Sequence, residues 1–200
     1  MKTYKIYLIR HGATEGNERG EYIGVTDLAL SGSGVLALAN LKDKIEYPQV
    51  EKVYTSPLTR CRQTANILYP DHECECIENL KEYDFGEFEG KTAVQLESNP
   101  DFYKWTSGQI SSPPGGEDST EFAKRICLGF HEVVEDMMSC GIHKAAVIMH
   151  GGAIMTLLSC CALPRRRSLE WTSEHGRGFS VLVTPSLYHS NGIIEVTEEI

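Results

Sequence analysis

The sequence has no apolar run long enough to span a bilayer, which takes about 20 consecutive residues. Its first residues, MKTYKIYLIRHG, also lack the longer apolar stretch and the small-residue cleavage site of a signal peptide, because Arg10 and His11 interrupt the apolar residues. There is no internal repeat and no low-complexity tract. We therefore expect a cytoplasmic protein that has no membrane partner.

Positive charge is scarce, since 19 Lys and Arg face 28 Asp and Glu and the formal net charge is −9. A nucleic-acid or anionic-membrane partner would require a basic face, so neither partner is expected. An anion-binding site in such a chain must gather its few cations. Arg10, Arg60 and Arg62 are the candidates.

Closely paired cysteines are missing as well, because none of the seven forms a C-x-x-C motif. Zinc and thioredoxin-like sites are therefore not indicated. The odd number and the absent signal peptide favour free thiols in a reducing compartment. Cys74 and Cys76 alternate within ECECIE and are predicted to share one face of a strand.

What the chain does have is the composition of an ordinary single domain, with 200 residues, 41% hydrophobic and 24% charged. Short apolar runs alternate with helical stretches, which predicts an α/β fold. Strands are predicted at 4–9, 52–55, 74–77, 144–149, 178–184 and 192–197. Helices are predicted over about 31–45, 59–68, 118–141 and 151–161, with Ser31 or Ser33, and Asp118 with Glu121, as their caps.

The stretch from 80 to about 117 interrupts this alternation. It is rich in glycine, ends in PPGGE and is predicted to be irregular with short helical pieces. A long insertion of this kind inside a compact domain is usually functional. We predict one domain over 1–200, with a substrate-side or lid segment at about 80–117.

Two histidines directly follow predicted strands. Arg10 and His11 come after the strand at 4–9, and His150 comes after the strand at 144–149. Ligands of α/β proteins bind at the carboxyl edge of the sheet, so both histidines are expected to face one pocket. A neutral imidazole can attack a phosphoryl group, and a guanidinium or Asn17 can hold its oxygens. A charged His150, with the helix amides that follow it, would donate to the same oxygens.

The segment TSPLTRCRQTA (55–65) predicts a second anion contact. Ser56 or Thr59 is expected to cap a helix and to place Arg60 in its first turn, where backbone amides also attract anions. Arg62 lies two residues further along and points elsewhere on the helix.

The segment NLKEYDFGEFEGKT (79–92) supplies the acid that phosphoryl transfer needs to protonate an alkoxide leaving group. Burial in a partly apolar pocket would raise the pKa of such a carboxyl group. Spacing does not choose among the four candidates, which are Glu82, Asp84, Glu87 and Glu89.

These four segments, in order and over nearly the whole chain up to about residue 160, resemble the histidine phosphatase superfamily, and its small phosphatase branch in particular. The resemblance implies a three-layer α/β/α sandwich around a mixed, mostly parallel sheet, as in phosphoglycerate mutases. It implies a metal-independent phosphomonoesterase without a cofactor, whose partner is a small phosphomonoester.

The resemblance also implies roles for individual residues. His11 would be the nucleophile that becomes phosphorylated, and Glu82 would be the general acid and base. The phosphate would be held by Arg10, Asn17, Arg60, His150 and the amide of Gly151.

Three further segments, at 20–34, 84–92 and 113–118, are similar to those of the alpha-ribazole phosphatases within the superfamily. That similarity implies removal of the 5′-phosphate from alpha-ribazole phosphate in cobalamin nucleotide-loop assembly, with Tyr22 and Gly24 on the substrate side. Ala13, Ala29 and GGED depart from common family residues. A broad-specificity phosphatase, a phosphoglycerate mutase and a non-catalytic module that binds phosphorylated ligands are the alternatives. The sequence indicates no oligomeric state.

The segment TSEHGRGFSVL (172–182) is unusual for this family. His175 and Arg177 could flank the pocket, but an ordinary turn before a strand is the favoured interpretation.

Overall fold

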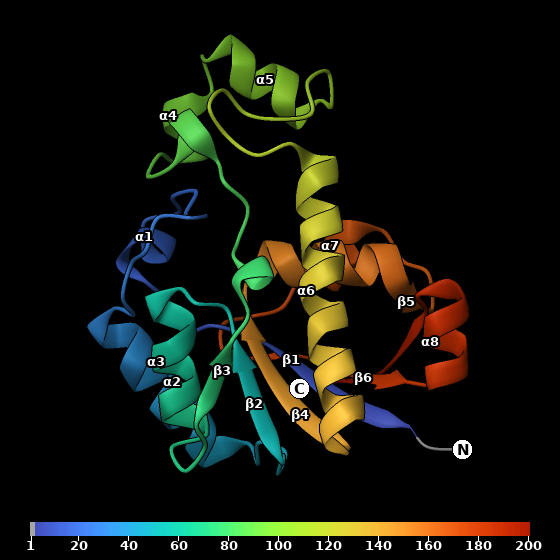
Figure 1. The fold of residues 1–200 in the computed structure, drawn as a ribbon. Helices are drawn as coiled ribbons and strands as arrows, with labels where there is room; N and C mark the ends of the chain where they lie inside the picture. Colours follow the sequence, from blue (N-terminus) through green and yellow to red (C-terminus); the bar gives the residue numbers. More distant parts are fainter. Residues whose placement is uncertain (1–2) are drawn as a thin grey trace.

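The computed structural model describes residues 3–200 and contains, within them, a seven-stranded sheet in the order β3-β2-β4-β1-β6-β7-β5 (Figure 1). Neighbouring strands from β3 to β1 are parallel, β6 is antiparallel to both β1 and β7, and β5 is parallel to β7. The predicted mixed, mostly parallel sheet is confirmed. The strands are β1 (Tyr4–Arg10), β2 (Lys52–Thr55), β3 (Cys74–Cys76), β4 (Lys144–Met149), β5 (Ala162–Leu163), β6 (Gly178–Val183) and β7 (Ile194–Glu199).

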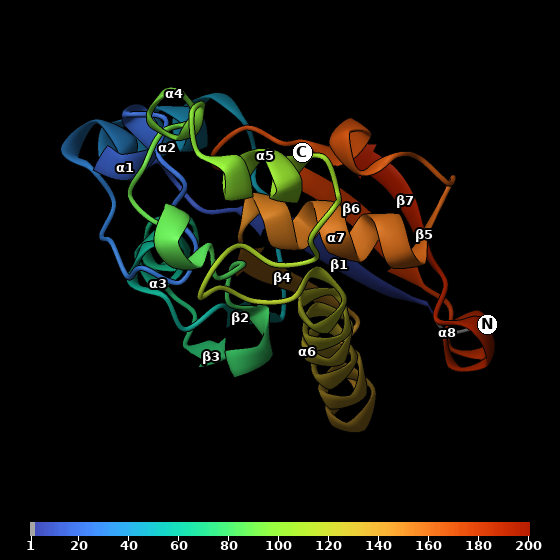
Figure 2. The ribbon, with the colours of Figure 1, turned by 90° about the horizontal axis from the view of Figure 1, so that it is seen from above.

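Helices cover both faces of this sheet (Figures 1 and 2). Ile6 and Leu8 of β1 pack in one apolar core with α6 and α7, whereas Tyr7 and Ile9 pack in a second core with α2 and α3. Burial on both faces explains why the central strands are continuous apolar runs. The helices are α1 (Glu15–Glu18), α2 (Gly32–Lys44), α3 (Thr59–Leu68), α4 (Ala93–Leu96), α5 (Pro100–Thr106), α6 (Ser119–Cys140), α7 (Gly151–Cys161) and α8 (Pro185–Asn191), with 3₁₀ turns η1 (Glu78–Leu80), η2 (Gly86–Phe88) and η3 (Ser168–Trp171).

Helix boundaries follow the predicted caps in part. Ser31 caps α2, Asp118 caps α6, and Gly141 ends α6 in the left-handed conformation with φ 70°. Glu121 does not return a bond to its cap, because its carboxylate pairs with Lys124. That part of the prediction is wrong.

The C-terminal part differs from the prediction. The last strand begins at Ile194 rather than at 192, and an unpredicted helix, α8, precedes it. Pro185 fits the first turn of α8 and Gly192 ends it with φ 64°, so the local signals were present. No helix within residues 3–200 is both long and apolar enough to cross a membrane.

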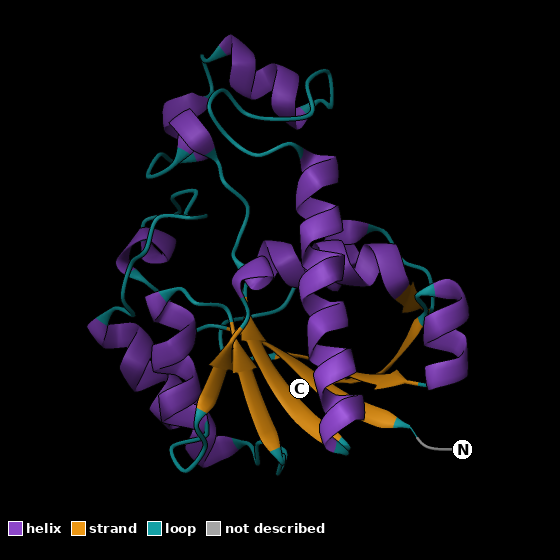
Figure 3. Ribbon diagram, in the orientation of Figure 1, coloured by secondary structure: helices purple, strands orange, loops and turns teal. Residues whose placement is uncertain are grey.

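The segment 80–117 is irregular as predicted, with η2, α4 and α5 as its short helical pieces. The parallel strands point their carboxyl ends toward it (Figure 3). Its two ends are joined where Gly86 packs on 114–116, since a Cβ on Gly86 would lie 2.3 Å from the Pro114 carbonyl oxygen. Its role as a lid, and a domain over 1–200, stay predictions.

Candidate active site

The structure brings His11 and His150 together at the carboxyl ends of neighbouring strands. Arg10 of β1 pairs with Met149 of β4, so the residues that follow both strands start at the same level. The His11 N–H donates to the Met149 carbonyl at 2.9 Å, and the two imidazole centroids lie 5.1 Å apart. The parallel register therefore builds one site from distant parts of the chain.

His11 is nearly buried and its tautomer is fixed. Its Nδ1 lies 2.6 Å from the Gly12 carbonyl oxygen, which can only accept, so Nδ1 carries the proton. The lone pair is then on Nε2. Burial, followed by the Arg60 guanidinium, holds the pKa of His11 well below its usual 6.5. His11 is thus a neutral imidazole with a free nucleophilic nitrogen.

Arg10 has several N–H groups left for a ligand. Its Nη1 donates to the Ser173 carbonyl at 2.7 Å, whereas its Nε is buried and has no hydrogen-bond partner among residues 3–200. The first residue of α7 approaches it closely, since a Cβ on Gly151 would lie 3.1 Å from that Nε. An unpartnered buried N–H of a guanidinium suits an anionic oxygen.

Arg60 is fully buried and is held by backbone carbonyls. Its Nη1 donates to Thr26 at 2.9 Å and its Nη2 to Gly24 at 2.6 Å, while its Nε faces Nδ1 of His150 at 3.3 Å. These contacts leave further N–H groups for a ligand. They also fix the guanidinium against the ring of His150.

The helix that carries Arg60 is not capped as predicted. Leu58 occupies the N-cap position and makes no side-chain cap. The cap comes from another segment, because Asp27 accepts from the N–H of Thr59 at 2.7 Å and from its hydroxyl at 2.8 Å. The Ser56 hydroxyl is instead hydrogen-bonded to Nε2 of His150.

His150 is neutral in this structure, whereas its predicted charge concerns the complex with a phosphoryl group and stays a prediction. Its Nδ1 accepts from Arg60, so the proton lies on Nε2, which donates to the Ser56 hydroxyl at 2.8 Å. Burial and then the Arg60 guanidinium hold the pKa of His150 well below 6.5. The ring is therefore neutral, and only an arriving anion would favour its charged form.

Glu82 is the carboxyl group that the structure brings to these histidines. It is buried, its Oε2 accepts from the Gly152 N–H at 2.8 Å, and its Oε1 accepts from the Tyr83 N–H at 2.9 Å. Burial raises the pKa of Glu82 above its usual 4.5 despite these hydrogen bonds. A Cβ on Gly152 would lie 2.6 Å from Oε1, so this glycine makes room for the acid.

The other three acidic candidates have different tasks. Asp84 accepts from the N–H of Gly86 at 2.8 Å, and Glu87 is exposed. Glu89 receives the backbone N–H groups of 24–26 and of Phe85 at 3.0 to 3.3 Å. Glu89 thus holds the loop whose carbonyls hold Arg60.

Gly24 has no polar group left for a substrate. Its N–H donates to Glu89 and its carbonyl accepts from Arg60. A Cβ at this position would lie 1.7 Å from the Tyr83 carbonyl oxygen. The backbone of Gly24 therefore connects Glu89 to Arg60 through hydrogen bonds. This structural role explains Gly24 better than the predicted contact with the substrate.

Asn17 and Arg62, two other predicted phosphate contacts, have fewer features of an anion site than Arg10 and Arg60. The Oδ1 of Asn17 accepts from the N–H and hydroxyl of Thr14 at the start of α1, which leaves its amide nitrogen for a ligand. Arg62 is exposed on α3 and makes no side-chain hydrogen bond to a residue in 3–200.

The loop 173–177 holds Arg10 and His11, against the interpretation favoured from the sequence. Nδ1 of His175 donates to the His11 carbonyl at 2.8 Å, and its ring centroid lies 5.4 Å from that of His11. The Gly176 N–H donates to the Arg10 carbonyl, and the Arg10 N–H donates to Arg177, both at 2.9 Å. In the sequence, the histidine in HGRG was the feature that could have indicated this contact.

A cavity of about 250 Å³ opens beside Glu82. Its walls are mostly apolar or aromatic, and none of its lining residues is basic. Tyr22 packs behind this wall, with its ring centroid 5.1 Å from that of Phe85 and 6.0 Å from that of Trp105. The apolar lining residues are Tyr83, Phe85, Trp105, Phe122 and Met155.

Known proteins resemble this chain in sequence and in fold. A relative from Hydrogenobacter thermophilus, provisionally named phosphoserine phosphatase 2, is 30% identical over 77% of this chain and 76% of its own. The adenosylcobalamin/alpha-ribazole phosphatase of Salmonella typhimurium is 25% identical over 78% of each chain. The crystal structure of an alpha-ribazole phosphatase from Shigella flexneri superposes with a TM-score of 0.79 over 96% of this chain and 94% of its own, at 19% identity, and thus shares the fold.

The family model described as the histidine phosphatase superfamily (branch 1) matches residues 6–181, which include both histidines, both arginines and Glu82. The chain belongs to the histidine phosphatase superfamily.

Proposed function

We propose that the chain is a metal-independent phosphomonoester hydrolase that forms a phosphohistidine on His11. The observation that carries the proposal is the hydrogen bond from Nδ1 of His11 to Gly12, which leaves a lone pair on Nε2 of a ring that feels the charges of Arg60 and Arg10. The monoester places its phosphate against Arg10, Arg60 and His150, and the anion raises the pKa of His150. Nε2 then attacks phosphorus in line with the leaving oxygen.

Glu82 carries the proton in both steps. Burial raises the pKa of Glu82 and so favours its protonated form, which can donate to the leaving alkoxide as the ester bond breaks. The resulting carboxylate removes a proton from water, which attacks the phosphohistidine and regenerates His11 and inorganic phosphate. No metal enters these steps.

The cavity beside Glu82 supports a leaving group with an apolar or aromatic body. A phosphoglycerate or a phosphoserine carries a carboxylate, for which the lining offers no basic partner. Alpha-ribazole, a nucleoside with an aromatic base, suits these walls better. We therefore propose alpha-ribazole 5′-phosphate as the substrate, in line with the Salmonella relative's name. The cytoplasmic location stays a prediction.

The test is phosphate release in EDTA from alpha-ribazole 5′-phosphate, p-nitrophenyl phosphate, phosphoserine, phosphoglycerate and a set of sugar phosphates. We expect alpha-ribazole phosphate to exceed the sugar phosphates by at least about 100-fold in kcat/KM, since apolar contacts of one base contribute about 3 kcal/mol. Comparable rates for all esters would indicate a broad-specificity phosphatase. Isomer exchange of phosphoglycerate would indicate a mutase, and phosphate binding without turnover a binding module.

Activity should depend on pH through two groups, one of which must be deprotonated and the other protonated. His11 must be neutral, and its lowered pKa keeps it so well below pH 6.5. Glu82 must be protonated, and its raised pKa keeps it so above pH 4.5. We expect kcat/KM to rise through the pKa of His11 and to fall through that of Glu82, with the falling limb absent in Glu82→Gln. A pH profile of the wild type without a falling limb would contradict this assignment.

A further inference from the structure

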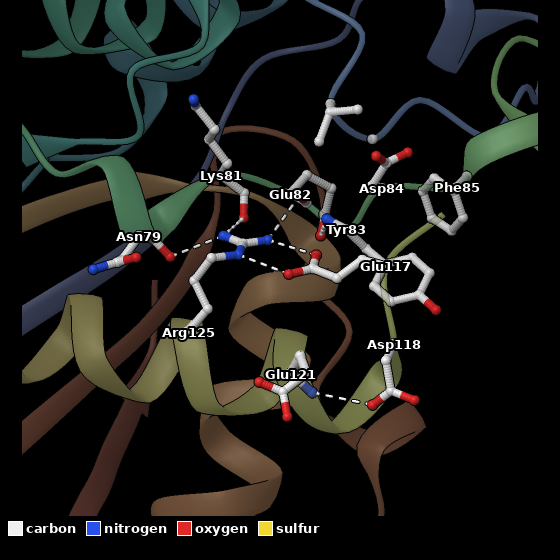
Figure 4. Close-up of polar contacts among 12 residues, drawn as sticks. Asn79, Lys81, Glu82, Tyr83, Asp84, Phe85, Glu117, Asp118, Glu121 and Arg125 are labelled. Carbon is white, nitrogen blue, oxygen red and sulfur yellow. Dashed lines mark hydrogen bonds and ion pairs between the residues drawn. The ribbon is translucent and has the colours of Figure 1, made fainter. Parts of the chain in front are cut away.

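Behind Glu82 lies a guanidinium whose five N–H groups all have acceptors. Arg125 of α6 donates through Nε and Nη2 to the two carboxylate oxygens of Glu117, at 2.8 and 2.7 Å. Its remaining N–H groups donate to three backbone carbonyls at 2.9 to 3.3 Å, those of Asn79, Lys81 and Glu82 (Figure 4). The Arg125 side chain therefore fixes the backbone from Asn79 to Glu82, which is the proposed general acid.

Glu117 is itself held in place, so the pair acts as a fixed clamp. Its N–H donates to the Asp84 carbonyl at 3.0 Å, and Asp118, the next residue, caps α6 through Thr120 and Glu121. The carboxylate of Glu117 and the guanidinium are both about four-fifths buried. A bidentate pair of this kind is short, directional and weakly screened by solvent.

We propose that Arg125 and Glu117 are positioning residues for Glu82. The carboxyl of Glu82 meets the Gly152 N–H on one side, and its backbone is fixed by Arg125 on the other. Without the clamp, the acid would lose its alignment with the leaving oxygen. This inference rests on the proposed role of Glu82 as the general acid.

The test separates geometry from charge. Arg125→Lys keeps a positive charge at this position, and that charge lowers the pKa of His150. A lysine has three N–H donors instead of five, however, and cannot form the bidentate pair with Glu117. Glu117→Gln removes the paired charge with almost no change in shape. Lys124→Ala is the matched control, because Lys124 lies next to Arg125 on α6 and forms an exposed pair with Glu121.

Each variant is assayed with p-nitrophenyl phosphate and with an alkyl phosphate, and the Glu82 carboxyl is titrated by ¹³C NMR. For Arg125→Lys and Glu117→Gln we expect kcat for the alkyl ester to fall about 100-fold, as for a misplaced catalytic group. We expect less than about a 3-fold loss for the nitrophenyl ester, whose leaving group needs no proton. KM should stay near wild type in Glu117→Gln, and the Glu82 titration should shift in both variants.

Equal losses for both esters, or an unshifted Glu82 titration, would overturn the clamp and leave a purely structural ion pair. So would unchanged kinetics in both variants. If the wild-type protein releases no phosphate at all, the proposed function fails, whereas the NMR titration still reports whether Arg125 and Glu117 control Glu82.

Discussion

Replacing His11 by alanine should abolish turnover, with kcat/KM falling by at least about 10⁴-fold, as for the loss of a catalytic nucleophile. The physical reason is that Nε2 of His11 keeps a free lone pair, whereas both nitrogens of His150 are engaged by Arg60 and Ser56. Steady-state phosphate release measures the effect. The loss of the phosphoenzyme is measured by mixing the protein briefly with ³²P-labelled ester, denaturing it rapidly without acid and counting the label that stays on the protein.

The matched control for this variant is His189→Ala, since His189 is half exposed on α8. Its kcat/KM and phosphoenzyme should equal those of the wild type. Phosphate binding by calorimetry shows whether His11→Ala retains the arginine contacts, so that a folding defect is recognised. If His11→Ala keeps activity within about 10-fold of wild type, the nucleophile is a different residue.

Replacing Glu82 by glutamine should slow esters with poor leaving groups by about 10² to 10⁴-fold, the usual contribution of general acid catalysis. The amide keeps the volume and can still accept from the Gly152 N–H, but it has no transferable proton. Esters with good leaving groups, such as p-nitrophenyl phosphate, should lose far less in the phosphorylation step. A series of aryl and alkyl phosphates, plotted against the pKa of the leaving alcohol, gives the comparison.

Glu87→Gln is the control for this series, because Glu87 is exposed in the same segment and should leave every rate unchanged. A Glu82→Gln variant that loses the same factor for every ester would count against Glu82 as the proton donor. Burst kinetics help here, since the burst reports phosphorylation of His11 and the later phase reports hydrolysis, in which Glu82 acts as the base.

Much of the fold follows from the sequence because its signals are local. The central strands are continuous apolar runs, and glycine or proline marks most of the places where they end. Arg10, His11 and His150 could be placed at one edge because parallel strands share their carboxyl ends. Helix α8 was missed although Pro185 and Gly192 delimit it.

The parts of the site that escaped prediction depend on contacts between distant segments. The neutral state of His150 depends on the depth of burial and on Arg60, neither of which its neighbours in the sequence reveal. Spacing alone could not distinguish Glu82 from Glu89, because both lie in one acidic run and only tertiary contacts separate them. His175 carries no family motif that would have marked its bond to the His11 carbonyl.

The contacts of β1 have a consequence for synthesis on the ribosome. β1 leaves the ribosome before its partners β4 and β6, and Arg10 and His11 are held by the loop 173–177, which directly precedes β6. Pairings this distant form slowly, because the intervening chain must be closed into a loop. A nascent chain that ends before β6 therefore has His11 but not the backbone that holds it. We expect the proposed phosphatase activity to be acquired in one late step, after β6 and the loop 173–177 have formed.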